Sequence, residues 1–331
     1  MLKYTQLGNS KIKISKFALG TWPFAGGDLW GEQDDSDSID AVNESIENGI
    51  NFFDTAPGYG EGRSEEVLGK ALFKKRQTNI IGTKVPANDL SPKDIRKACE
   101  MSLKRLKTDY IDLYQIHWPN HDLPIDDSVN ELKKLKEEGK ILTLGVSNFG
   151  IKDFTEITDL TEVVTNQLPY NGFWRAIEFE IKPLCVSKGS GVICYSPLAQ
   201  GLLTGRYRKV EDVPDGVSRS RLFSKDTSRL CRHKDSGCED LLFDCIDKLI
   251  NLSNTYNLDP AVMSLCWLKK QKGVISMLVG ARNKKEVILN KSSFENEISD
   301  EISTLFNEIT EPIKNHIGDN PDMWNATSWY R

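Results

Sequence analysis

The chain has 331 residues, of which 39% are hydrophobic and 27% charged, a composition typical of a soluble globular protein with a large core. The length suits two domains or one α/β barrel. The formal net charge is only −5 and the pI is about 5.6, so no basic field predicts binding to nucleic acid or to an anionic membrane.

Targeting and redox signals are the next features. Residues 1–16 lack the apolar segment of a secretion signal, and no window reaches the roughly 18 apolar residues of a spanning helix. Seven cysteines without a CxxC pair indicate reduced thiols, and we expect a cytoplasmic protein. Cys231, His233, Cys238 and Cys245 form the one suggestive cluster. Their spacing matches no common zinc motif, so we expect loop or buried thiols and no metal site.

Eight runs rich in β-branched and aromatic residues alternate with amphipathic segments. The runs cover residues 17–21, 50–56, 79–85, 111–118, 142–149, 163–169, 191–197 and 274–281. Helical patterns include residues 36–48, 91–106, 127–138, 239–256 and 260–272. Because the strands are continuously apolar and alternate with helices, they indicate parallel strands buried on both faces. The pattern predicts one (β/α)8 TIM barrel domain over residues 1–331.

Two segments do not fit this repeat. Residues 4–14 alternate around a Gly8-Asn9 turn, which predicts a hairpin that caps the N-terminal end of the barrel. Residues 205–237, after the seventh run, form a polar loop that is too long for a simple connection. We interpret it as a lid or cofactor clamp; the alternative is a disordered surface insert.

Polar residues end several of the predicted strands, where barrels of this kind carry their chemistry. They are Asp54 with Tyr59 beyond it, Lys84, His117, Ser147, Asn148, Asn166 and Gln167. Each has a structural explanation of its own. Lys84 could simply pair with Asp54, His117 could be a core histidine, and Ser147 with Asn148 could cap the next helix. Their convergence at one rim nevertheless predicts an active site.

Short motifs along the chain resemble those of the aldo-keto reductases. They are GTW at 20–22, DTAPGYG at 54–60, TK at 83–84, IHWP at 116–119, GVSNF at 145–149, NQ at 166–167, YSPLAQGLLTG at 195–205 and GAR at 280–282, followed by Asn290. PLAQGLLTG and GAR resemble the branch of bacterial inositol- and sugar-handling enzymes and potassium-channel β-subunits. The resemblance implies a nicotinamide-dependent carbonyl reductase whose catalytic residues are Asp54, Tyr59, Lys84 and His117.

Carbonyl reduction explains these four residue types. Tyr59 would be the general acid that protonates the developing alkoxide. We expect the Lys84 cation to lower the phenol pKa from about 10, and Asp54 to hold the buried ammonium. His117 would either orient the carbonyl oxygen or relay a proton in the oxidative direction, and the sequence does not choose between them.

A set of residues is expected to hold the cofactor. Ser147, Asn148 and Gln167 would bind the carboxamide, Tyr195 would stack on the nicotinamide, and the amides of residues 196–203 would bind the pyrophosphate. No GxGxxG follows a strand. The full expected set is Gly20, Thr21, Trp22, Ser147, Asn148, Gln167, Tyr195, Ser196, Pro197, Leu198, Gln200, Gly201, Leu203, Arg206, Gly280, Arg282, Glu286 and Asn290.

The adenosine end carries opposing signals. By resemblance Arg282 meets a 2′-phosphate, as a guanidinium suits. Glu286 stands where this branch usually has Gln, and a carboxylate would repel that phosphate or accept from a 2′-hydroxyl. Lys284 and Lys285 keep the local charge positive. The sequence therefore favours NADP, with NAD or dual use as the alternative.

Trp22, Trp30 and Trp118 are expected to wall the substrate pocket, although Trp30 could be a core residue. An aromatic wall with few charges suits a neutral aldehyde, ketone or sugar. The oligomeric state stays open, with a monomer preferred. Two other functions stay open as well: a slow redox-sensing subunit that binds nicotinamide, and a metal-dependent hydrolase using Asp54 and His117, which lacks further ligands at the strand ends.

Overall fold

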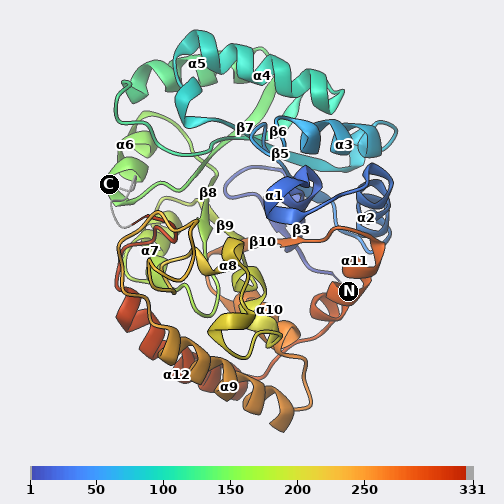
Figure 1. The fold of residues 1–331 in the computed structure, drawn as a ribbon. Helices are drawn as coiled ribbons and strands as arrows, with labels where there is room; N and C mark the ends of the chain where they lie inside the picture. Colours follow the sequence, from blue (N-terminus) through green and yellow to red (C-terminus); the bar gives the residue numbers. More distant parts are fainter. Residues whose placement is uncertain (1, 326–331) are drawn as a thin grey trace.

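The structure is a computed structural model that describes residues 2–325 (Figure 1). Parallel strands close into a barrel in the order β10-β3-β4-β5-β6-β7-β8-β9, which confirms the predicted fold. The barrel strands are β3 (Phe17–Gly20), β4 (Phe52–Asp54), β5 (Ile80–Val85), β6 (Ile111–Ile116), β7 (Ile141–Ser147), β8 (Thr165–Pro169), β9 (Gly191–Tyr195) and β10 (Val274–Gly280).

Helices surround this barrel (Figure 1). They are α2 (Asp35–Glu47), α3 (Arg63–Leu72), α4 (Pro92–Leu106), α5 (Ile125–Glu137), α6 (Ile151–Leu160), α7 (Ile181–Ser187), α10 (Pro260–Lys270) and α11 (Lys284–Glu295). Short helical turns are η1 (Trp22–Ala25), α1 (Gly27–Trp30), η2 (Arg76–Thr78), η3 (Ala87–Asp89) and η4 (Ala176–Glu178). The five helical patterns predicted from the sequence all lie on helices, with ends that differ by up to two residues.

Side-chain caps explain where several helices begin. Ser91 accepts a hydrogen bond from Asp94 N at 3.2 Å, and Pro92 occupies the first turn of α4 as predicted. Asp259 caps α10 through Ala261 N at 2.8 Å. These caps fix the first residues of α4 and α10.

The N-terminal hairpin closes the barrel from below, as predicted. β1 (Tyr4–Gln6) pairs antiparallel with β2 (Lys13–Ser15). Leu7 and Ile14 pack with inward residues of the strands, among them Leu113 and Ile193. Gly8 has φ +56°, and a Cβ there would lie 2.1 Å from the Val164 carbonyl oxygen, so the turn presses directly on the barrel.

The connection after β9 is folded rather than an unstructured insert. It contains η5 (Ala199–Thr204), η6 (Val210–Asp212) and α8 (Asp215–Ser218) before α9 (Glu239–Thr255). The last helix, α12 (Asp300–Ile317), packs against α9 (Figure 1). Beyond it, the chain returns to the long connection, since Arg221 Nη1 donates to the Asp322 carbonyl at 2.9 Å. No helix in residues 2–325 is long and apolar enough to span a membrane.

Candidate active site

The ends of β4 and β5 bring together a carboxylate, an ammonium and a phenol. The side chains of Lys84 and Asp54 are 0% and 2% exposed. Lys84 Nζ donates to Asp54 Oδ2 at 2.7 Å, to the Thr55 carbonyl at 2.9 Å and to the Tyr59 hydroxyl at 3.3 Å. The buried ammonium therefore uses all three of its N–H groups.

Tyr59 reaches the pair from the turn that follows β4. Its N–H donates to the Ala56 carbonyl at 3.1 Å, and its carbonyl accepts from Ser64 N at 3.2 Å. Gly60 has φ +62°, and a Cβ there would lie 3.0 Å from the Cα of Ala25. Glycine thus allows the turn to close against the neighbouring loop.

The second oxygen of Asp54 is held by two amides. Gln167 Nε2 donates to Oδ1 at 2.8 Å, and Gln115 Nε2 donates to it at 3.3 Å. Gln115 was not among the predicted site residues, although it lies two residues before His117 and so on the same face of its strand. A Cβ at Gly145 would lie 3.1 Å from Gln115 Cγ, so this glycine leaves room for the amide.

Burial and charge set the protonation of Tyr59 and Lys84. Burial raises the pKa of Tyr59 by more than the Lys84 ammonium lowers it, and Asp54 raises it further. The prediction that the pKa of Tyr59 lies below its usual value is therefore wrong, although Lys84 by itself lowers this pKa as expected. Burial lowers the pKa of Lys84, but Asp54 and Tyr59 together raise it above its usual value. At neutral pH the pair is a protonated phenol beside a charged ammonium.

His117 follows β6 and lies at the mouth of the barrel. Its ring is edge-on to Tyr59, with centroids 6.1 Å apart. Burial, and then the Lys84 charge, lower the pKa of His117 to about 3, so the imidazole is neutral at physiological pH. Asn148 Nδ2 donates to the His117 carbonyl at 3.0 Å and fixes its backbone. A neutral imidazole favours orientation of a carbonyl over transfer of a proton.

Two of the three predicted tryptophans form an aromatic cluster with Tyr59. Trp22 stacks on Tyr59 with a centroid distance of 5.8 Å, and Trp30 meets Trp22 edge-on at 5.4 Å. Trp30 is on α1, outside the barrel strands, and is half-buried. Trp118 is half-buried and packs against the core at the same rim.

The long connection contributes a cation that the sequence analysis missed. Arg219 follows α8, and its guanidinium carbon lies 6.0 Å from the Trp22 ring centroid and 4.4 Å from that of Trp324. Burial, and then Arg232, lower the pKa of Arg219. The long connection therefore reaches the mouth of the barrel, as a lid would. It places a charged guanidinium beside Trp22 in the aromatic wall of the pocket. No sequence pattern marked this contact, because it joins segments far apart in the chain.

The residues expected around the carboxamide form one hydrogen-bonded group. Tyr195 OH donates to Asn148 Oδ1 at 3.0 Å, and Asn148 Nδ2 donates to Ser147 Oγ at 3.0 Å. Ser147 Oγ donates to the Gln167 carbonyl at 3.1 Å. Asn166 is directed elsewhere, because its Nδ2 donates to the Phe149 carbonyl at 2.9 Å.

The turn after β9 has unusual backbone. Ser196, Ala199, Gln200 and Gly201 have φ values of 50°, 49°, 54° and 98°. Such left-handed residues are costly unless the surroundings hold them. The turn is held by its own hydrogen bonds, since Ala199 N donates to the Ser196 carbonyl and Gly201 N donates to the Leu198 carbonyl, both at 2.9 Å. A Cβ at Gly201 would lie 2.5 Å from Arg206 Nη2, so the guanidinium rests on this turn. The same turn includes the other residues expected there, Pro197, Leu198 and Leu203.

The adenosine end has its own network. Arg282 Nε donates to Gln33 Oε1 at 2.9 Å, and its Nη2 donates to the Glu32 carbonyl. Glu286 Oε2 accepts from Arg282 N at 2.7 Å. Lys284, which the sequence suggested as a local positive charge, pairs with Glu44 at 2.8 Å. These contacts weaken the positive field expected from the sequence.

The remaining predicted residues flank these groups. Gly20 pairs in register with both Asp54 and Gly280. Thr21 Oγ1 donates to the Asp54 carbonyl at 2.9 Å. Asn290 lies on α11, one turn after Glu286.

The cysteine cluster takes no part in this site. Cys231 Sγ contacts the carbonyls of Ser218 and Ser224, and Cys245 Sγ donates to the Ile309 carbonyl at 3.1 Å. Within residues 2–325, no three His, Cys, Asp or Glu side chains are grouped to hold a metal ion.

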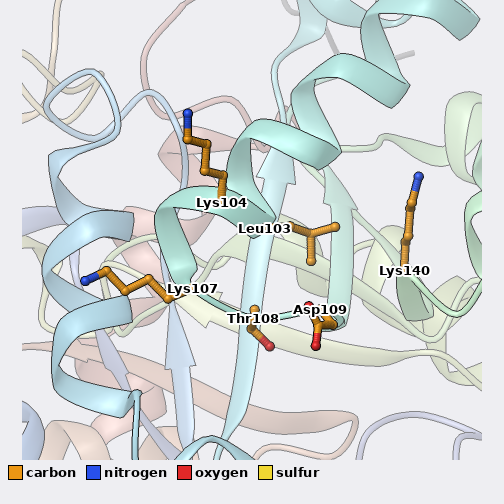
Figure 2. A pocket seen from close by; sticks show the side chains of 6 residues that line it. All are labelled: Leu103, Lys104, Lys107, Thr108, Asp109 and Lys140. Atoms are coloured by element: carbon orange, nitrogen blue, oxygen red, sulfur yellow. The ribbon is translucent and has the colours of Figure 1, made fainter.

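A shallow surface groove lies at the opposite end of the barrel. Figure 2 shows the side chains that line it, which are Leu103, Lys104, Lys107, Thr108, Asp109 and Lys140. They come from the end of α4 and the segments before β6 and β7. This groove is therefore remote from the strand ends that carry Asp54 and Lys84.

The chain is similar to known proteins over nearly its whole length. Residues 16–311 match the model of the aldo/keto reductase family. An NADH-specific methylglyoxal reductase from Escherichia coli is 33% identical over 95% of this chain and 100% of its own length. Among solved structures, a glycerol dehydrogenase from Gluconobacter oxydans is 31% identical over 96% of this chain and 97% of its own, with a TM-score of 0.81. An aldo-keto reductase from Klebsiella pneumoniae in complex with NADPH is 26% identical over 98% of this chain and 99% of its own, with a TM-score of 0.74.

Proposed function

Since the chain belongs to the aldo/keto reductase family, we propose that it catalyses reversible, NAD(P)-dependent reduction of the carbonyl group of a small aldehyde, ketone or sugar. One observation carries this proposal. The Tyr59 hydroxyl lies 3.3 Å from an ammonium that is itself anchored 2.7 Å from a carboxylate. This arrangement suits a phenol that gives up and takes back a proton.

Each residue of the site has its own role in the proposed reaction. A bound nicotinamide would supply the hydride. Tyr59 donates its proton to the developing alkoxide, and Lys84 stabilises the phenolate left behind. Asp54 keeps the ammonium in place, while Gln115 and Gln167 keep Asp54 in place. Neutral His117 orients the carbonyl oxygen by a hydrogen bond.

The site's donor set fits a dinucleotide. Ser147, Asn148 and Gln167 would hold the carboxamide, and Tyr195 would stack on the ring. The left-handed turn at residues 196–201, with Arg206 resting on it, suits a pyrophosphate. Gly20, Thr21 and Trp22 would line the nicotinamide end, and Gly280 and Asn290 the adenosine end.

The hydrogen bonds at Arg282 shift the cofactor preference. The sequence favoured NADP through this guanidinium, but a 2′-phosphate would have to displace Gln33 and to lie beside Glu286. A 2′-hydroxyl would instead find an acceptor in the Glu286 carboxylate. We therefore propose that NADH is used at least as well as NADPH. The NADH specificity of the Escherichia coli relative supports this choice.

The wall of the pocket limits the substrate. Trp22, Trp30 and Trp118, the aromatic wall predicted from the sequence, suit a small aldehyde, ketone or sugar. Arg219 beside Trp22 adds a positive charge that a neutral substrate does not need. The substrate set therefore includes aldehydes with a carboxylate or phosphate group. We expect the enzyme to act in the cytoplasm as a monomeric single-domain barrel.

Steady-state turnover tests the function. Purified protein is assayed with a panel of neutral and anionic aldehydes, ketones and polyols, with both cofactors and in both directions. Reduction at about 1 s⁻¹ or faster with at least one aldehyde is expected, within the usual range for enzymes. Tight nucleotide binding with no turnover on any member would favour the alternative, a redox-sensing subunit.

A further inference from the structure

A buried carboxylate outside the catalytic group connects the elements that carry Tyr59 and Lys84. Glu65 lies in the first turn of α3, and its side chain is 0% exposed. Its Oε1 accepts from Thr83 Oγ1 at 2.6 Å, and its Oε2 accepts from Arg105 Nε at 2.6 Å. Thr83 is the residue before Lys84 on β5. One carboxylate thus links α3, β5 and α4.

Two glycines show that α3 rests directly on Arg105. Gly62 has φ +96°, and a Cβ there would lie 2.6 Å from Arg105 Cδ. A Cβ at Gly69 would lie 2.5 Å from the Arg105 carbonyl oxygen. Neither position has room for a side chain. The contact between α3 and the end of α4 is therefore fixed at both sides of Glu65.

The start of α3 also holds the turn that presents Tyr59. Arg63 N donates to the Gly60 carbonyl at 3.0 Å, and Ser64 N donates to the Tyr59 carbonyl at 3.2 Å. Ser64 Oγ donates to the Thr21 carbonyl at 2.8 Å. A displacement of this helical turn would therefore move the phenol.

We propose that Glu65 and Arg105 are a positioning pair that sets the Tyr59 hydroxyl against the Lys84 ammonium. The inference rests on the proposed function. The carboxylate fixes the helix after Tyr59 to the strand before Lys84, so the 3.3 Å contact between the two groups depends on it. Neither residue of the pair touches the reacting atoms.

Glu65→Gln tests the pair, because it keeps the shape and removes the charge. We expect kcat to fall about 10-fold to 100-fold, as small misplacements of catalytic groups do, with the Kd of the cofactor changed less than about twofold. The ultraviolet titration of the Tyr59 phenol, assigned by difference from Tyr59→Phe, should shift to higher pH because Lys84 no longer lies as close.

Asp112→Asn is the matched control. Asp112 forms another buried ion pair, with Arg76 at 2.7 Å, and accepts from Ile81 N at the opposite end of β5. This variant should lose stability as Glu65→Gln does, yet keep the parent kcat and phenol titration. Should Glu65→Gln not fold, Thr83→Val and Arg105→Lys take its place, each with a smaller fall in kcat and the same shift in titration.

Parent kcat and parent titration in folded Glu65→Gln would overturn the proposal, as would an equal fall of kcat in Asp112→Asn. A parent protein without turnover on any carbonyl compound would refute the proposed function instead. In that case the Tyr59 titration still decides whether the pair positions the phenol.

Discussion

The Lys84 ammonium donates to the Tyr59 hydroxyl at 3.3 Å, while Asp54 holds the same ammonium at 2.7 Å. The shorter contact is with Asp54, which anchors the ammonium, and the longer one is with Tyr59, the proposed general acid. Lys84 can therefore shorten its bond to Tyr59 as the phenolate forms, which places the stabilisation in the transition state.

Tyr59→Phe is expected to lower kcat by at least about 100-fold and to leave the Kd of the cofactor nearly unchanged, because it removes only the proton donor. Stopped-flow turnover and nucleotide titration measure the two quantities. Tyr114→Phe is the control, since this buried hydroxyl has no hydrogen-bond partner among residues 2–325. Turnover of Tyr59→Phe close to that of the parent would refute the mechanism.

Lys84→Met should also lower kcat by about 100-fold, and it should shift the pH dependence of alcohol oxidation. In that direction Tyr59 acts as a base and must lose its proton. The Lys84 charge lowers the pKa of the phenol, so its removal moves the rising limb to higher pH. Reduction, which uses the protonated phenol, should stay nearly flat around pH 7 in the parent. An unshifted oxidation limb in Lys84→Met would contradict this assignment.

His117 should contribute to the acid sensitivity of the fold. Its pKa is lowered from 6.5 to about 3, so between these values the unfolded chain binds a proton that the native chain does not. The contribution of His117 to the free energy of unfolding therefore falls as the pH falls from 6.5 to about 3. Urea unfolding at pH 7 and pH 5 should show a smaller loss for His117→Gln than for the parent. The exposed His316→Gln serves as control, and equal losses in all three proteins would argue against a neutral His117.

Strand ends could be located from the sequence because hydrophobic runs stop at polar residues. Asp54, Lys84 and His117 follow from this pattern together with the rule that barrel chemistry lies at the C-terminal ends. Gln115 could also have been found, since it alternates with His117. Arg219 and Trp324 could not, because their contacts with the mouth depend on the folding of a long connection and of the segment after α12.

Protonation was harder to predict than position. The sequence places a lysine near Tyr59 but does not show how deeply the phenol is buried, and burial outweighs the charge. The contacts at the adenosine end were hard to predict for a similar reason. The sequence places Arg282 four residues before Glu286, but the partners of its guanidinium, Gln33 and Glu32, lie in a loop about 250 residues away in the chain.

Arg219→Met should change KM for anionic substrates but not for neutral ones. If the guanidinium beside Trp22 meets a carboxylate or phosphate of the substrate, KM for anionic aldehydes should rise about tenfold or more, the usual range for a lost charge-assisted bond. KM for neutral aldehydes should stay within about twofold. Arg229→Met, an exposed arginine on the same connection, is the control. A uniform change across both substrate classes would show that Arg219 acts through the cofactor or the loop instead.

The cofactor preference should respond to Glu286 and Gln33. Glu286→Gln removes a carboxylate beside the Arg282 N–H, so NADPH should gain about tenfold in affinity relative to NADH, which corresponds to about 1.4 kcal/mol. Gln33→Ala frees the Arg282 guanidinium and should act in the same direction. Titration of tryptophan fluorescence with each nucleotide gives the ratio of Kd values.

Lys284→Ala is the control for the cofactor preference. It removes a nearby cation that Glu44 already neutralises, so it should leave the ratio of the Kd values for NADPH and NADH nearly unchanged. A parent protein that binds NADPH more tightly by about 1.5–3 kcal/mol would show that Arg282 releases Gln33 to meet the phosphate, as the sequence alone favoured. If no variant at Gln33, Arg282 or Glu286 moves the ratio, the 2′ position is recognised elsewhere. Arg206, on the turn after β9, is then the first residue to substitute.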